Sequence, residues 1–257
     1  MKVIISGAGG RMGRALIEVS KEFPQIEISG LLEKQGHPMI GKKVEGIEVK
    51  SSLREVIDSG DVLIEFTSPE ASLEHLKIVK EKKKGMVLGT TGFNEEEKEV
   101  INQAGKEIPI VFSYNMSVGM NLFFHILGEV TRILGRDYEV EILEIHHHHK
   151  KDAPSGTALT LGEIIAANRG QKLKEVAVFG RKGKTGERKR EEIGIHALRG
   201  GGVVGEHQIL FLSQGERIEF VHRAESRLAF ARGAMRAAIW LEGKKPGVYN
   251  MEDVLFK

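Results

Sequence analysis

One short segment concentrates most of the side chains in this sequence that could carry out acid–base chemistry. Residues 144–158 read Glu-Ile-His-His-His-His-Lys-Lys-Asp-Ala-Pro-Ser-Gly-Thr-Ala. An imidazole exchanges protons near neutral pH and therefore serves well as a general acid or base. We take Lys150 as a candidate proton donor, with a histidine of the run as the alternative donor.

The four histidines also suggest metal binding, because histidine is the commonest metal ligand in proteins. However, the segment does not place them on a helix at the spacing of a recognised zinc pattern. If the segment is extended, His146 and His148 face one side, and His147 and His149 face the other. We therefore predict acid–base chemistry without a metal. The remaining alternative for any one histidine is a supporting or surface position.

The end of this segment predicts an anion-binding site. Ser155 is a favourable helix N-cap, and Gly156 and Thr157 then fall in the first helical turn, where backbone N–H groups have no partner within the helix. Helix N-termini attract anions for this reason. Combined with the histidines and lysines that precede it, this site favours a substrate that carries carboxylate groups.

A glycine loop near the start of the chain predicts a second anion site. Residues 7–13 read Gly-Ala-Gly-Gly-Arg-Met-Gly, between an apolar run at 2–6 and a helical pattern at 11–21. A strand, a glycine turn and a helix in this order suit the pyrophosphate of a dinucleotide. The glycines are Gly7, Gly10 and Gly13 rather than the usual G-x-G-x-x-G, because Met12 takes the sixth position. The alternative is a simple strand-to-helix turn.

Glu33 strengthens the dinucleotide interpretation. It lies 20 residues after Gly13, at the end of the next expected strand, where a carboxylate bonds the adenosine ribose hydroxyls. A glutamate repels a 2′-phosphate and favours NADH, whereas Lys34 could reach the phosphate of NADPH. Both cofactors therefore stay open, and the alternative for Glu33 is an ordinary surface carboxylate.

Three later loops carry small polar residues after expected strands. They read Phe66-Thr67-Ser68, Gly89-Thr90-Thr91-Gly92 and Ser113-Tyr114-Asn115-Met116. The carboxyl ends of parallel strands line one crevice, so these loops together describe one cleft in which a nicotinamide could lie against backbone.

The elements that position these groups fall into two regions. Before residue 113, strands expected at 2–6, 26–32, 62–66, 86–88 and 108–112 alternate with helices, which predicts a parallel sheet covered on both faces. After a long apolar helix at 117–134, strands at 138–145, 176–179, 193–198, 206–213 and 216–222 follow at a density that predicts a mixed or antiparallel sheet. The fold class is thus α/β, a Rossmann-like parallel sheet plus a second, α+β domain.

Composition excludes several classes of protein. The net charge of +2 gives no bulk field for nucleic acid or an anionic membrane. The absence of cysteine excludes disulfides, thiolate metal sites and a thiol nucleophile. No run approaches the roughly 18 apolar residues of a membrane span, so we expect a cytoplasmic protein. The basic stretch 181–190 is either a solvated surface loop or a loop over an anionic ligand.

At this point the motifs resemble one family over essentially the whole chain. The glycine loop at 7–13, Gly89-Thr90-Thr91-Gly92-Phe93, the segment 144–158 and Gly201-Gly202-Val203-Val204-Gly205-Glu206-His207 are similar to the 4-hydroxy-tetrahydrodipicolinate (formerly dihydrodipicolinate) reductase family of bacterial lysine and diaminopimelate biosynthesis. The resemblance implies that NADH or NADPH reduces a cyclic dicarboxylate to tetrahydrodipicolinate, with loss of water.

The resemblance also implies roles for individual residues. It assigns His146 as proton donor and acceptor, Lys150 as proton donor, and His147, Gly156 and Thr157 as substrate-binding residues. The cofactor contacts that it implies are Gly7, Ala8, Gly9, Gly10, Arg11, Met12, Glu33, Lys34, Gly89, Thr90, Thr91, Ser113, Tyr114, Asn115 and Met116. It implies neither a metal nor a nucleic-acid or membrane partner.

Family resemblance further implies the domain organisation and the assembly. Residues 1–117 and 228–257 would form the dinucleotide-binding domain, and residues 118–227 the domain for substrate binding and oligomerisation. The implied assembly is a homotetramer with the sheet of the second domain at its core. The alternatives are another NAD(P)-dependent dehydrogenase of small carboxylates or sugars, and a non-catalytic nicotinamide- or metal-binding module.

Overall fold

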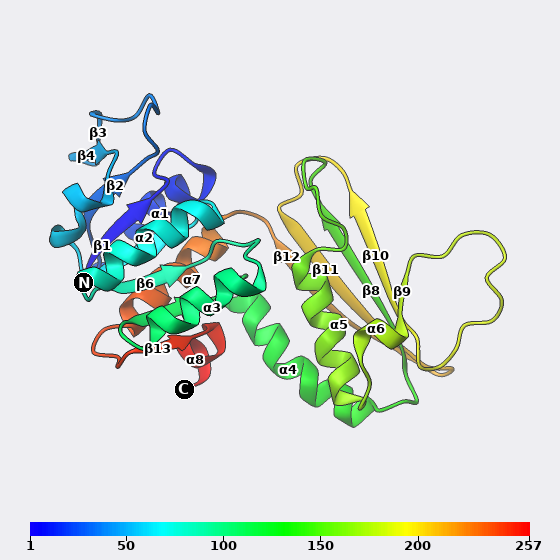
Figure 1. Cartoon of the computed structure of the whole chain (residues 1–257). Helices are drawn as coiled ribbons and strands as arrows, with labels where there is room; N and C mark the ends of the chain where they lie inside the picture. The colour runs from blue at the N-terminus through cyan, green and yellow to red at the C-terminus, as the bar shows by residue number, and fades with distance from the viewer. The chain divides into compact units, whose positions relative to one another are not determined.

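Strand β1 (Lys2–Ser6) lies inside a sheet of eight strands, seven from the first 112 residues and one from near the C-terminus (Figure 1). The computed structural model describes all 257 residues. The order of strands is β13 (Gly247–Tyr249), β7 (Pro109–Phe112), β6 (Gly85–Leu88), β5 (Val62–Glu65), β1, β2 (Glu27–Leu32), β4 (Ile47–Lys50) and β3 (Lys43–Val44). All neighbours pair in parallel except β3 and β4, which are antiparallel.

This sheet is apolar on both faces because helices cover both. Helices α1 (Arg11–Ser20) and α7 (Leu228–Trp240) pack on one face, where Leu16 and Ala234 join Val3 and Ile5 in one core. Helices α2 (Pro69–Glu81) and α3 (Glu95–Gly105) pack on the other face, with the short 3-10 turns η1 (Leu53–Glu55) and η2 (Ile57–Ser59). Strands covered on both sides read as continuous apolar runs, as Val62-Leu63-Ile64 does.

The chain order of the strands places a switch point beside β1. The chain runs from β1 to β2 on one side and to β5, β6 and β7 on the other. Ligands of open α/β sheets bind outside the carboxyl ends of the strands at such a point. The glycine loop after β1 therefore lies where the topology favours a ligand.

A second, five-stranded sheet carries the histidine segment. Its order is β12 (Arg217–Ala224), β11 (Gly205–Leu212), β8 (Glu139–His146), β10 (Ile193–Arg199) and β9 (Ala177–Phe179). The pairs of β11 with β12 and with β8 are antiparallel, whereas β10 pairs in parallel with β8 and β9. Helices α4 (Val118–Leu134) and α5 (Gly156–Asn168) cover one face, and the short α6 (Leu173–Val176) precedes β9.

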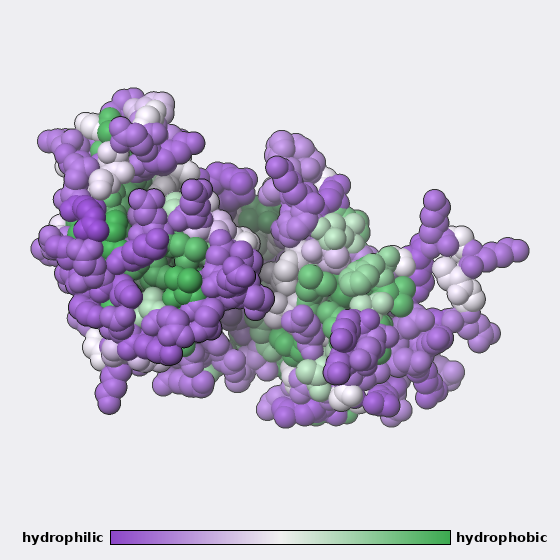
Figure 2. Space-filling view, in the orientation of Figure 1, coloured by the Kyte–Doolittle hydropathy of each residue, from purple (hydrophilic) through white to green (hydrophobic).

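Contacts between residues divide the chain into two compact units. The first comprises Met1–Val118 and Arg227–Lys257, and the second comprises Gly119–Ser226. The last helix, α8 (Met251–Phe256), buries Met251 in the core of the first unit. In Figure 2, hydrophilic residues cover most of the visible face of the first unit, whereas apolar residues reach the surface around α5, whose sequence is apolar on most sides.

The predicted fold class is confirmed: a parallel sheet is followed by a mixed sheet with its own helices. Three short strands were not predicted, namely β3, β4 and β13. Each has four residues or fewer and at most one buried position, so no apolar periodicity marks it. None of the helices combines the length and the apolar character that crossing a membrane requires.

Candidate active site

The histidine segment begins with a fully buried carboxylate, that of Glu144. Strand β8 directs alternate residues to its helix-covered face, which brings Glu144 and His146 to the same side. The Glu144 side chain has no exposed surface, and its Oε2 lies 2.6 Å from Nδ1 of His146. The Arg199 guanidinium donates to both carboxylate oxygens, at 2.7 and 2.8 Å, and the Ser155 N–H donates at 2.9 Å.

These contacts keep Glu144 ionised inside the protein. Burial by itself raises the pKa of this carboxyl group, but the hydrogen bonds from His146, Arg199 and the Ser155 N–H outweigh it and lower the pKa to about 2. A buried carboxylate is tolerated only when its charge is compensated in this way. Glu144 therefore joins the end of β8, the end of β10 and the start of α5. We call Glu144 and its partners His146, Arg199 and Ser155 the Glu144 group.

His207 on β11 completes this group. It is 4% exposed, and its Nε2 lies 3.1 Å from Oγ of Ser155. Its ring meets that of His146 edge to face, with the ring centroids 5.2 Å apart. Burial lowers the pKa of His207 to about 3, and the neighbouring His146 adds to this effect. His207 is therefore neutral at neutral pH, beside an imidazole that contacts a carboxylate.

The rest of the histidine run leaves the strand. β8 ends at His146, and the chain turns so that Lys150 N–H donates to the carbonyl of His147 at 3.1 Å. The rings of His148 and His149 are only 3.8 Å apart, so these neighbours do not face opposite sides. The expected alternation, which required an extended segment, is therefore wrong beyond His146. No group of three or more potential ligands among His, Cys, Asp and Glu is arranged to hold a metal ion.

The start of α5 has the expected cap. Ser155 Oγ accepts the Ala158 N–H at 3.2 Å, which leaves the first-turn residues Gly156 and Thr157 next to the Glu144 group. Gly156 is exposed, and a Cβ at this position would meet nothing within 4 Å. Lys150 Nζ lies 2.9 Å from Oδ2 of Asp152, and its charge contributes to the lowered pKa of His207. The structure thus gathers the predicted proton donors around one helix N-terminus.

The glycine loop of the first unit forms a cradle that suits a pyrophosphate. Gly7 adopts a φ of +70°, and a Cβ on Gly13 would lie 2.1 Å from the Gly7 carbonyl oxygen. Gly10 caps α1 without a side-chain hydrogen bond, and the first turn carries no acidic residue. The first N–H groups of α1 therefore keep their capacity to bind phosphate oxygens. These residues fit a nicotinamide dinucleotide.

Glu33 lies beside this loop at the carboxyl end of β2. Its Oε2 accepts the Gly9 N–H at 2.8 Å, and its Oε1 accepts the Lys34 N–H at 3.0 Å. Lys34 itself is exposed. His37 also approaches the loop, because a Cβ on Gly9 would lie 2.6 Å from its ring. The carboxylate thus stands at the edge of the predicted cofactor loop and bonds its backbone.

The other predicted cofactor residues differ in what they expose. Ala8 and Met116 have side chains buried in the core, so they can offer a ligand only backbone atoms. Arg11 and Thr91 are exposed, and Met12 is half-buried. Tyr114 is 52% exposed and packs edge-on against Phe112. The remaining members of the set are Gly89 and Thr90, which are buried, and Ser113 and Asn115, which are half-buried.

Comparison with known proteins identifies the family. The family models described as Dihydrodipicolinate reductase, N-terminus and C-terminus match residues 1–116 and 119–255. The chain belongs to the dihydrodipicolinate reductase family. The 4-hydroxy-tetrahydrodipicolinate reductase of Pseudomonas fluorescens is 47% identical to it, covering 99% of this chain and 98% of that protein. The reductase of Syntrophus aciditrophicus is 46% identical with the same coverage.

Solved structures show the same fold. The dipicolinate-bound dihydrodipicolinate reductase from Paenisporosarcina sp. TG-14 superposes with a TM-score of 0.77 at 24% identity and covers 99% of both chains. A probable dehydrogenase from Thermotoga maritima gives a TM-score of 0.64 at 12% identity, covering 99% of this chain and 92% of that one. The resemblance to the reductase family inferred from the motifs is confirmed by the family models and by the relatives that are 46–47% identical.

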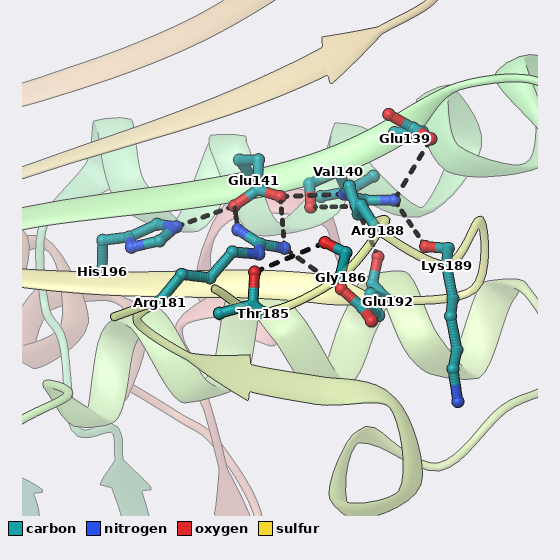
Figure 3. A network of polar contacts seen from close by, with 10 residues as sticks. All are labelled: Glu139, Val140, Glu141, Arg181, Thr185, Gly186, Arg188, Lys189, Glu192 and His196. Atoms are coloured by element: carbon teal, nitrogen blue, oxygen red, sulfur yellow. Dashed lines mark hydrogen bonds and ion pairs between the residues drawn. The ribbon is translucent and has the colours of Figure 1, made fainter. Parts of the chain in front are cut away.

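In this member of the dihydrodipicolinate reductase family, the basic stretch 181–190 is partly tied down by ion pairs. Figure 3 shows Arg181 and Arg188 directed toward Glu141, which also contacts His196 at 2.7 Å. Both arginines donate to Glu141 at 3.0 Å. Burial raises the pKa of Glu141, but these hydrogen bonds lower it to about 2. Arg181 also pairs with Glu192 and Arg188 with Glu139, so each of these two arginines has a carboxylate partner besides Glu141 within the chain.

Several members of the reductase's candidate site were not predicted from the sequence. Glu144 and His207 belong to the motifs that carry the family resemblance but had no predicted role, and Arg199 had no predicted role either. Glu144 had a readable signal, because a carboxylate two residues before His146 on a strand points to the same face. Arg199 had none, since its contact with Glu144 depends on the pairing of β10 with β8.

Proposed function

We propose that this protein reduces 4-hydroxy-tetrahydrodipicolinate to tetrahydrodipicolinate in diaminopimelate and lysine biosynthesis. One hydride from NADH or NADPH and one proton enter the ring, and one water leaves. The observation that carries the proposal is the Glu144 group, which holds His146 at the N-terminus of α5. Full-length similarity to named reductases supports it, and the relative from Paenisporosarcina sp. TG-14 binds dipicolinate, a planar dicarboxylate.

In this proposal the first unit holds the cofactor. The N–H groups at the start of α1 bind the pyrophosphate, and Gly7, Gly10 and Gly13 let the backbone approach it. Glu33 and Lys34 lie where the adenosine ribose would be recognised, so that the lysine also accommodates NADPH. When bound, the nicotinamide supplies the hydride.

The second unit holds the substrate and supplies the proton. The first turn of α5, with Gly156 and Thr157, binds one carboxylate of the substrate, and His147 assists. His146 and Lys150 are the residues that transfer the proton. Each carries a side-chain nitrogen beside a carboxylate, His146 beside Glu144 and Lys150 beside Asp152. Glu144 orients the His146 ring, since a hydrogen bond at Nδ1 leaves Nε2 as the nitrogen available for proton transfer.

We also propose the division of labour between domains and the assembly. Residues 1–117 and 228–257 bind the dinucleotide, and residues 118–227 bind substrate and form a homotetramer. The face of the second sheet opposite α4 and α5 supports the assembly, because it exposes Leu198 (44%) and Val221 (42%). Light scattering of the purified protein tests this, and a monomeric mass would contradict it. We propose that the reaction takes place in the cytoplasm.

A coupled assay tests the activity. Dihydrodipicolinate synthase, pyruvate and aspartate semialdehyde generate the unstable substrate, and the loss of reduced nicotinamide absorbance follows the reaction with either cofactor. We expect oxidation that requires all three components and this protein. Oxidation of neither NADH nor NADPH, under conditions where a known reductase is active, would overturn the proposal.

A further inference from the structure

A second fully buried carboxylate lies in the first unit, far along the chain from the candidate catalytic residues. Glu65 is the last residue of β5 and has no exposed surface. Its Oε2 lies 2.6 Å from Nδ1 of His75 on α2, and its Oε1 accepts a hydrogen bond from the Thr67 hydroxyl. The three preceding residues of β5 are apolar and buried, so Glu65 is the only polar side chain of the strand and lies at its carboxyl end.

Stability does not explain why an acid occupies this position. A buried ion pair seldom stabilises a protein more than well-packed apolar side chains of the same volume. The basic group that contacts Glu65 is an imidazole whose side chain is 19% exposed, and not a bidentate arginine as at Glu144. The explanation must therefore come from what the Glu65 contacts hold in place.

These contacts fix the loop that follows β5. Thr67 is held from two directions, because its hydroxyl donates to Glu65 while its N–H donates to Oγ1 of Thr90 at 3.1 Å. Ser72 on α2 donates to the same Thr90 oxygen at 2.8 Å. Thr90 belongs to the Gly89-Thr90-Thr91 loop, so the network joins the loops that follow β5 and β6. Thr90 and Ser72 are 3% and 1% exposed.

Thr67 and the preceding residue Phe66 lie directly against two glycines of the proposed cofactor site. The Thr67 methyl group lies 3.0 Å from the position of a Cβ on Gly7, the residue with φ +70° at the start of the glycine loop. The Phe66 ring lies 2.0 Å from the position of a Cβ on Gly89. Residues 66 and 67 therefore pack against both glycine loops, the one that begins at Gly7 and the one that begins at Gly89.

We propose that the buried Glu65 and the half-buried His75 form a clamp that positions the cofactor loops through Thr67. In this proposal the clamp does not contact the dinucleotide. It fixes the position of Thr67 relative to Gly7 and Thr90. A displacement of about 1 Å in residues remote from the reacting atoms is enough to lower rates or affinities substantially. The inference rests on the proposed placement of NADH and NADPH at these loops, and it extends that proposal to two residues behind the site.

Threonine 67 offers a matched pair of variants. Thr67→Val keeps the methyl group against Gly7 and removes the hydroxyl, which leaves one oxygen of Glu65 without its donor. Thr67→Ser keeps the hydroxyl and removes the methyl group. We expect the Kd for NADH, measured by fluorescence titration, to rise about tenfold in Thr67→Val, equivalent to about 1.4 kcal/mol, and by less than about threefold in Thr67→Ser.

Variants of the pair itself test whether Glu65 acts through Thr67. Glu65→Gln and His75→Leu should each raise the Kd for NADH about tenfold, whereas His75→Asn keeps a donor near the Nδ1 position and should restore much of the affinity. In the double variant Glu65→Gln/Thr67→Val, the Kd should rise no more than in the worse single variant. Glu74→Gln, on the exposed side of α2, is the control and should bind NADH like the unaltered protein.

Each outcome decides the matter. Equal NADH affinity in Thr67→Val and the unaltered protein, with only a lower melting temperature, would mean that the network serves stability alone. A larger loss in Thr67→Ser than in Thr67→Val would assign the effect to packing and not to the hydrogen bond. Either result overturns the clamp while the proposed activity stands. Failure of the unaltered protein to bind NADH or NADPH would instead overturn the proposed function.

Discussion

Nδ1 of His146 lies 2.6 Å from Oε2 of Glu144, and the same carboxylate accepts the Ser155 N–H at the start of α5. One side chain therefore connects a candidate acid–base group to the helix terminus proposed to bind the substrate. Because Arg199 compensates the charge of Glu144 in a bidentate pair, the carboxylate can orient His146 without being protonated itself.

Removal of the Glu144 charge should impair both chemistry and stability. Glu144→Gln should lower kcat roughly 100-fold, because the His146 ring loses its orienting partner. It should also lower the free energy of unfolding by about 3 kcal/mol, since Arg199 is left without its buried counter-charge. Steady-state kinetics and urea unfolding measure the two effects. The Kd for NADH should stay within about twofold, and a kcat close to that of the unaltered protein would argue against the orienting role.

Lys150 and Lys151 provide a comparison between neighbours. Lys150→Ala should lower kcat by at least about 100-fold, as expected for loss of a proton donor, and should barely change the Kd for NADH. Lys151 is exposed, so Lys151→Ala should keep most of the turnover. Steady-state kinetics with the coupled assay compares the two. Near-normal kcat in Lys150→Ala would refute the assignment of this lysine as proton donor.

His207 should make stability depend on pH below neutrality. In the unfolded chain this histidine takes up a proton near its ordinary pKa of 6.5, whereas in the folded protein burial lowers the pKa to about 3. The unfolded state binds more protons between these values, so the free energy of unfolding falls as the pH drops through this window. The limiting slope is about 1.4 kcal/mol per pH unit.

His207→Gln tests this dependence, because the amide can still contact Ser155 but does not titrate. Urea unfolding between about pH 7 and pH 5 should show a flatter profile for this variant than for the unaltered protein. Parallel profiles would show that His207 is protonated to the same extent in both states.

The Gly13 position should tolerate no side chain. A Cβ there would lie 2.1 Å from the Gly7 carbonyl oxygen and 2.7 Å from Cα of Ala8, so the loop must move apart from the helix. Gly13→Ala should raise the Kd for NADH at least about tenfold, or about 1.4 kcal/mol. Gly215→Ala is the control, since a Cβ at this turn meets nothing within 4 Å and φ is not left-handed. Fluorescence titration decides, and equal affinities would remove the glycine loop from the cofactor site.

Glu141 should control the exposure of the basic stretch 181–190. In Glu141→Gln the charge that holds Arg181 and Arg188 is lost, so the loop should open more often. Limited trypsin digestion should then cut within this stretch about tenfold faster, because cleavage follows the population of the open form. Glu187→Gln, an exposed position in the same stretch, is the control. Equal cleavage rates would show that the loop is held by other contacts.

Local patterns in the amino-acid sequence predict most of the longer strands and helices and the residue types of the loops that follow them. Apolar runs such as Val62-Leu63-Ile64 mark buried strands, and the glycines at 7–13 mark a tight turn into a helix, because these signals are local. Ser155 likewise predicted the start of α5, since an N-cap side chain accepts a hydrogen bond from a residue that closely follows it.

Contacts between residues that are distant along the chain follow from strand pairing and helix packing. Arg199 reaches Glu144, 55 residues earlier in the chain, only because β10 pairs in parallel with β8 in one register. His75 meets Glu65 because α2 packs back over the sheet, and His207 meets Ser155 because β11 lies beside β8. Such contacts depend on strand pairing and helix packing, which no local pattern of residue types encodes. The partners that Glu144 and Glu65 find inside the protein therefore follow from the tertiary structure.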